Sequence, residues 1–105
     1  MSDLPPNPVL RKLGLPNDAR VVVLHADDIG MCQASVTAWE ELLDAGIMSS
    51  AATMVPCAWY PTVARLCRER AGDKRIDMGV HLTLTSEWHG YRWGPLSSRQ
   101  RDTGL

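Results

Sequence analysis

The segment RVVVLHADDIG, residues 20–30, is the strongest structural signal in the chain. Four consecutive apolar residues occupy positions 21–24, and three of them are β-branched. Such a run is typical of a strand that is buried on both faces, as in a parallel sheet. Two acidic residues follow at positions 27 and 28, and they end the apolar run. We therefore predict a strand over residues 20–26, followed by a turn.

A helical pattern comes directly after this turn, from residue 32 to residue 45. Val36, Trp39 and Leu43 recur at a spacing that places them on one face of a helix. Gly46 follows as a residue well suited to end the helix. We predict an amphipathic helix that buries these three side chains.

The alternation of strands and helices continues as far as residue 84. The sequence predicts a second strand over residues 47–55, a second helix from Pro61 to about residue 72, and a third strand over residues 76–84. Helical crossovers between successive strands predict a parallel sheet built from right-handed βαβ units. The expected fold class is therefore α/β, with residues 85–105 as an extended loop.

Length and composition limit the number of domains and the kinds of partner. The 105 residues suffice for one small domain, which we place at residues 20–105 after a proline-rich N-terminal extension, residues 1–19. A net charge of −1 gives no basic surplus for binding nucleic acid, and no apolar run is long enough to span a membrane. Three cysteines without C-x-x-C spacing, and no secretory signal at the N-terminus, predict a cytoplasmic protein with reduced thiols.

Two acidic residues and one histidine stand out as possible metal ligands. Asp27 and Asp28 follow the first strand, where the carboxyl ends of parallel strands hold ligand sites. In an alternating third strand, His81 shares the polar face with Thr83 and Thr85. Carboxylate and imidazole groups together suit zinc, nickel, cobalt or manganese. The alternative is a helix cap and a solvated turn residue for the two aspartates, and a hydrogen-bonded core residue for the histidine.

The remaining histidines and the aromatic residues near the C-terminus allow several interpretations. We expect His25 to support the site or to pack in the core, and His89 to lie exposed on a loop. The side chains of Trp88, Tyr91 and Trp93 suit stacking on a sugar ring, and they equally suit anchoring of the loop. Both interpretations stay open.

Four motifs resemble, in order along the chain, those of the YdjC-like carbohydrate deacetylases. They are HADDIGM at residues 25–31, SSAATMVP at residues 49–56, GVHLTLT at residues 79–85, and SEW at residues 86–88 with YRWGP at residues 91–95. The resemblance covers roughly residues 20–95. It implies an irregular (β/α) barrel related to the polysaccharide deacetylases, and removal of N-acetyl groups from sugars such as chitin-derived oligosaccharides.

The resemblance also implies a role for each residue of the motifs. Asp28 and His81 correspond to metal ligands, and Asp27 corresponds to the general base. The expected cofactor is a divalent ion, zinc or magnesium first, with nickel, cobalt or manganese as alternatives. The expected partner is an acetylated sugar or oligosaccharide, which Trp88, Tyr91 and Trp93 would contact.

The length of the chain departs from the pattern of the family. A complete barrel of this kind needs about 250 residues, and this chain supplies three strands. Family members carry a further metal-binding histidine beyond the position that corresponds to Leu105. We therefore expect the chain to match the N-terminal part of a deacetylase and to be inactive alone. The alternative is a non-catalytic α/β module that binds metal weakly, or that self-associates through an unpaired strand edge.

A phosphoacceptor receiver domain is the third interpretation, because it too places paired acidic residues after its first strand. That class of protein requires an acceptor aspartate at the end of the third strand and a later lysine. Here Asp77 lies at the start of the third strand, and no lysine follows Lys74. The pattern therefore favours the metal-dependent hydrolase over the receiver domain.

Overall fold

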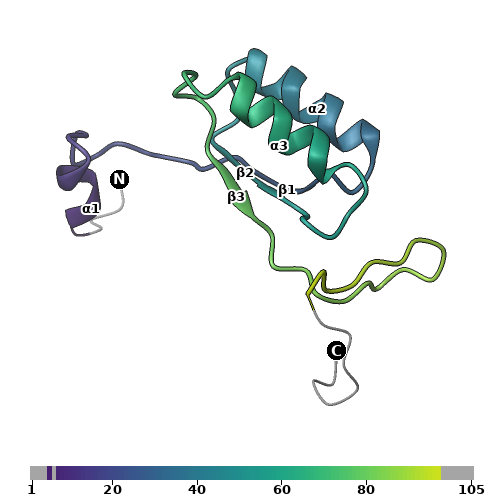
Figure 1. Cartoon of the computed structure of the whole chain (residues 1–105). Helices are drawn as coiled ribbons and strands as arrows, with labels where there is room; N and C mark the ends of the chain where they lie inside the picture. Colours follow the sequence, from purple (N-terminus) through teal and green to yellow (C-terminus); the bar gives the residue numbers. More distant parts are fainter. Residues whose placement is uncertain (1–4, 6, 98–105) are drawn as a thin grey trace.

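The computed structural model describes residue 5 and residues 7–97. Helices and strands alternate along the chain after a short first helix (Figure 1). The elements are α1 (Pro8–Lys12), β1 (His25–Ile29), α2 (Gln33–Asp44), β2 (Ser50–Thr53), α3 (Tyr60–Glu69) and β3 (Met78–Val80). The last part of the predicted loop, residues 98–105, lies outside the described residues. No helix among the described residues is long and apolar enough to cross a membrane.

The three strands form one parallel sheet in the order β1-β2-β3. Ala26 of β1 lies beside Ala51 of β2, which in turn lies beside Met78 of β3. The predicted α/β class and the parallel arrangement of the strands are thus confirmed.

Both long helices cover the same face of this sheet (Figure 1). Val36, Trp39 and Leu43 of α2 are buried in one cluster with Val63 of α3 and Ala51 of β2. The helical face predicted from the spacing in α2 is therefore the face that packs. The opposite face of the sheet carries no helix in the described part of the chain.

The first predicted strand is wrong in its position and in its burial. The sheet pairing begins at His25 rather than Arg20, because β2 starts at Ser50, directly beside His25. The apolar residues before it have no neighbouring strand and no covering helix within the described ranges. Val21, Val22 and Val23 are accordingly 59%, 72% and 68% exposed.

The other two strands are shorter than predicted. The structure limits β2 to residues 50–53 and β3 to residues 78–80, because pairing stops where the neighbouring strand ends. Val80, Leu82 and Leu84, which were expected to share one strand face, are largely exposed. The edge of the sheet next to β3 therefore presents apolar side chains that no layer of the described residues covers.

A charged network ties the last turn of α2 to the loop that precedes β3. Asp73 accepts hydrogen bonds from the side chains of Arg75 and Arg70, and Arg70 also pairs with Asp44 of α2. The hydrogen bonds from Arg75 hold the pKa of the Asp73 carboxyl well below its usual range. This network lies at the amino-terminal ends of the strands and fastens the two βα units together.

Gly30 occupies the tightest backbone position, immediately after β1. Its φ is +93°, and a Cβ placed there would lie 3.2 Å from both Thr53 Oγ1 and the Tyr60 amide nitrogen. Gly46 also has a positive φ, +74°, but a Cβ there meets nothing within 4 Å. The two glycines therefore share a similar backbone strain and differ in crowding.

We expect Gly30→Ala to lower the free energy of unfolding by about 1–3 kcal/mol more than Gly46→Ala, because only the former overpacks its surroundings. Urea denaturation of the two variants and the parent chain measures the difference. Equal destabilisation by the two substitutions would show that the neighbours of Gly30 move aside without lowering the free energy of unfolding.

Candidate metal centre

An irregularity at the end of β1 brings two adjacent carboxylates to the same side of the sheet. In a regular strand, Asp27 and Asp28 would point to opposite faces. The pairing register shifts between Ala26 and Ile29, and Asp28 adopts a φ of +82°. A bulge of this kind redirects side chains, and aspartate is one of the few residues other than glycine that tolerate a positive φ. The strain is therefore located at the residue that the sequence predicts to be a ligand.

Hydrogen bonds at the carboxyl ends of the strands place His81 opposite these carboxylates. His81 follows β3 directly, and its amide donates to the Thr53 carbonyl oxygen at 2.9 Å. The Thr53 hydroxyl donates in turn to the Ile29 carbonyl oxygen at 2.7 Å. Thr53 thus fastens the ends of all three strands, and with them the cluster.

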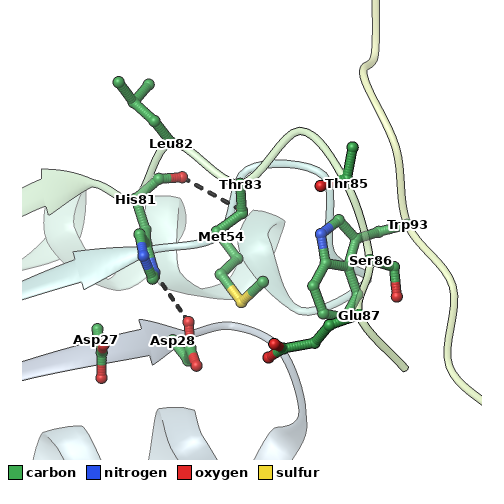
Figure 2. A pocket seen from close by; sticks show the side chains of 10 residues that line it. All are labelled: Asp27, Asp28, Met54, His81, Leu82, Thr83, Thr85, Ser86, Glu87 and Trp93. Atoms are coloured by element: carbon green, nitrogen blue, oxygen red, sulfur yellow. Dashed lines mark hydrogen bonds and ion pairs between the residues drawn. The ribbon is translucent and has the colours of Figure 1, made fainter. Parts of the chain in front are cut away.

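The three predicted residues form one cluster. Each of Asp27, Asp28 and His81 offers one ligand atom, and these atoms all lie within 4.8 Å of one another. His81 Nδ1 and Asp28 Oδ1 are 2.8 Å apart (Figure 2). The side chains of His81 and Asp28 are 33% and 45% exposed, so the cluster remains open to solvent.

The contact between His81 and Asp28 is not aligned as a hydrogen bond. His81 Nδ1 is buried and has no hydrogen-bond partner among the described residues, although the carboxylate oxygen lies close to it. A buried polar atom left without a partner is costly, and such an atom calls for an explanation. Imidazole nitrogen and carboxylate oxygen atoms that converge in this way fit a shared divalent cation.

The cluster forms one wall of a cavity of about 440 Å³. Thr83 and Thr85, which were predicted to share the polar face of His81, also line it. The remaining lining residues are Met54, Leu82, Ser86, Glu87 and Trp93 (Figure 2). Met54, Leu82, Ser86 and Glu87 were not predicted as lining residues. Ser86 and Glu87 lie in a loop without periodicity, and the signal that could have found them is the SEW motif at residues 86–88, as SSAATMVP could have found Met54.

The three predicted aromatic residues lie in different surroundings. Trp93 lines the cavity, whereas Trp88 is 51% exposed and Tyr91 is outside the lining. The Tyr91 hydroxyl donates to the Met31 carbonyl oxygen at 2.7 Å, and the rings of Tyr91 and Trp93 meet edge to face at 5.6 Å. Tyr91 therefore anchors the loop, and Trp93 is placed for contact with a ligand.

The environment of Tyr91 also involves the loop that follows β2. Burial raises the pKa of Tyr91, the backbone of Ala58 lowers it, and Cys57 raises it further. Burial likewise raises the pKa of the Cys57 thiol, against a hydrogen bond from Tyr91. Loops from all three strands thus meet at the Tyr91 hydroxyl.

The two other histidines lie outside the cluster, and His25 is exposed rather than packed in the core. The Nδ1 atom of His25 forms a 2.7 Å hydrogen bond with Ser50 Oγ, and His89 is exposed. His25 thereby ties β1 to β2 near the site without offering a ligand atom to it.

Fold and site together define a class of protein. This class is a parallel α/β protein that gathers two carboxylates and an imidazole beside a cavity at the carboxyl ends of its strands. The family model described as YdjC-like protein matches residues 21–103, and the chain belongs to this family.

One curated relative has a name that states an enzymatic activity. The chain is 38% identical over 89 residues to a protein named carbohydrate deacetylase from Thermus thermophilus. The aligned region covers 85% of this chain but 28% of the relative. The chain thus spans less than a third of the length of the relative that it matches.

Proposed function

We propose that this chain carries the metal-binding, N-terminal part of a carbohydrate deacetylase, in which Asp28 and His81 hold a divalent ion and Asp27 is the general base. The observation that carries the proposal is the cluster of Asp27, Asp28 and His81, with its unpartnered His81 nitrogen beside a carboxylate oxygen among the described residues. The printed name of the Thermus relative supplies the activity.

The reaction that fits these residues is amide hydrolysis of an N-acetyl group. A bound divalent ion supplies a Lewis acid for the acetyl carbonyl and lowers the pKa of a water molecule. Asp27, adjacent to both proposed ligands, accepts the proton of the attacking water, which is the task of a general base. The open side of the cluster faces the cavity, where an acetylated sugar has room to bind.

The barrel belongs to the same proposal. Strand order follows chain order, and both crossover helices cover one face of the sheet. This singly wound arrangement is the one that closes into a (β/α) barrel. The exposed apolar residues at positions 21–23 and at Leu82 mark the surfaces that further strands would cover.

Two protein ligands hold a transition metal weakly, since structural sites use four ligands and catalytic sites use three. We therefore propose that a further ligand comes from a segment such as those that the Thermus relative has outside the matched region, which make up most of its length. The 105 residues alone would bind zinc, or more weakly magnesium, without catalysing the reaction.

We place the protein in the cytoplasm on the basis of its free cysteines, Cys32, Cys57 and Cys67.

A second candidate function is a non-catalytic module that self-associates. The observation in its favour is that the outer strands β1 and β3 have no further neighbouring strand among the described residues, while Val22 and Leu82, close to them in the chain, are 72% and 86% exposed. Unpaired strand edges with apolar side chains favour pairing with another chain. Sedimentation analysis separates the candidates, because a stable oligomer that binds no metal would favour this module over the deacetylase.

Acetate release tests the proposed reaction. We expect no detectable release from N-acetylated chitooligosaccharides by the 105 residues alone. A chimera that joins residues 1–95 to the segment of the Thermus relative beyond the matched region should release acetate. The chimera with Asp27→Asn should bind metal normally and react about 100-fold more slowly or worse, as expected for loss of a general base.

Two results would count against the proposal. A folded, metal-loaded chimera that releases no acetate from a broad panel of acetylated sugars would argue against deacetylation. Full activity of the Asp27→Asn chimera would remove the role of Asp27 and leave the reaction itself intact.

A further inference from the structure

Trp93 carries a buried hydrogen-bond donor that no other described residue satisfies. Its Nε1 atom has no hydrogen-bond partner within the described part of the chain. Trp93 lines the same cavity as Asp28 and His81, and Figure 2 shows the indole nitrogen on the side of the ring that faces Thr83. An indole N–H donates and cannot accept, so it requires an acceptor oxygen. An acceptor that enters the cavity would satisfy this donor.

Glu87 supplies the complementary group on the same wall of the cavity. Its carboxylate only accepts hydrogen bonds, and Figure 2 shows it extending toward the Asp28 side of the cavity. Glu87 forms no ion pair or side-chain hydrogen bond with another described residue. A donor beside an acceptor suits a sugar, since each hydroxyl of a sugar both donates and accepts.

Hydrogen bonds within the loop fix this wall relative to the metal cluster. Ser86 Oγ donates to the Tyr91 carbonyl oxygen at 2.8 Å and closes the loop on itself. The Tyr91 hydroxyl donates to the Met31 carbonyl oxygen, and the Met31 amide donates to the Asp28 carbonyl oxygen at 3.1 Å. Tyr91 also supports Trp93 through the edge-to-face contact of the two rings, at an angle of 62°. A chain of contacts therefore connects Asp28 to Trp93.

We propose that Trp93 and Glu87 form the sugar-holding wall of the site. Trp93 Nε1 donates a hydrogen bond to an oxygen of the acetylated sugar, and Glu87 accepts one from a hydroxyl of the same sugar. Tyr91 is a positioning residue: its hydroxyl is anchored on the Met31 carbonyl oxygen, and its ring supports Trp93 by direct contact. This assignment rests on the proposed function. It differs from the prediction that a sugar ring stacks on the face of Trp93, because here the sugar forms a hydrogen bond with the edge of the indole.

Nuclear magnetic resonance of the ¹⁵N-labelled chain tests the assignment with N-acetylglucosamine as the probe and zinc present. The four tryptophans give four indole N–H signals, and Trp93→Phe identifies the signal of Trp93. We expect this signal to move on titration with N-acetylglucosamine, and to move much less with glucose at equal concentration. Trp93→Phe keeps an aromatic edge but removes the donor, and we expect it to weaken sugar binding about fivefold.

Glu87→Gln provides a second variant on an exposed side chain, where folding is undisturbed, and it should weaken binding to a similar extent. If the Trp93 indole signal does not move on titration with N-acetylglucosamine, the assignment is overturned, regardless of whether the signals of other residues move. An equal response to glucose would do the same. Zinc binding is measured separately, so a failure of the metal site is distinguishable from a failure of the sugar-holding wall.

Discussion

We expect that replacing His81 with alanine lowers the affinity of the chain for zinc by at least about 100-fold. Loss of a residue that only supports a ligand costs about 10- to 100-fold, and loss of the ligand itself should cost no less. Asp28→Ala should have a comparable effect, because each substitution leaves only one of the two proposed protein ligands. Isothermal titration of the untagged chain with zinc measures the change. Magnesium, which prefers six oxygen ligands, should bind the parent chain more weakly than zinc.

His89→Ala is the matched control for this experiment. His89 is an exposed histidine on the loop after β3, outside the cluster of potential ligand atoms. Its removal should leave zinc affinity unchanged, while circular dichroism checks that all variants keep the fold. Zinc binding that survives both His81→Ala and Asp28→Ala would refute the assignment of the two ligands.

Trp39→Ala removes the largest fully buried side chain of the core and should destabilise the fold most strongly among single substitutions. Trp39 of α2 is 2% exposed and packs in the cluster with Leu43 and Val63. Truncation of such a side chain costs about 3–5 kcal/mol, a large part of the roughly 5–15 kcal/mol that stabilises an ordinary domain. Urea denaturation followed by circular dichroism should show a much lower midpoint or an unfolded chain.

Glu41→Ala tests the same helix on its solvent side. Glu41 lies two residues after Trp39 and is exposed, so the substitution should change stability by less than about 0.5 kcal/mol. Equal and small effects of the two substitutions would mean that α2 does not pack on the sheet as the structure shows.

The sequence predicts the order of elements well and the extent of the strands poorly. The spacing of Val36, Trp39 and Leu43 is a local property of one helix, and the packed face follows from it directly. The burial of Val21–Val23 depends on layers that the described residues do not supply, and the apolar run therefore misleads. Strand ends depend in turn on where the neighbouring strand stops, which is a property of the sheet as a whole.

The members of the candidate site were predictable, while their geometry was not. Asp27 and Asp28 follow from their position after the first predicted strand, and His81 follows from its place on the polar face of the third. The surrounding motifs support all three. The bulge that gives Asp28 a φ of +82° could not be predicted from the sequence. This bulge is what lets two adjacent carboxylates face the same cluster. Glu87 belongs to an aperiodic loop, whose path is set by the bond from Tyr91 to Met31, 60 positions apart in the sequence. Long-range contacts of this kind leave no local pattern.

The central claim is that Asp28 and His81 bind a divalent ion through oxygen and nitrogen. X-ray absorption at the zinc edge of the zinc-loaded chain tests it directly, because it distinguishes oxygen and nitrogen neighbours from sulfur. Burial raises the pKa of the Cys57 thiol and the charge of Asp28 raises it further, so a nearby thiol is the alternative ligand that this measurement tests. We predict only oxygen and nitrogen neighbours, at about 2.0–2.1 Å from zinc. A sulfur neighbour at about 2.3 Å would place the ion on a cysteine and contradict the site.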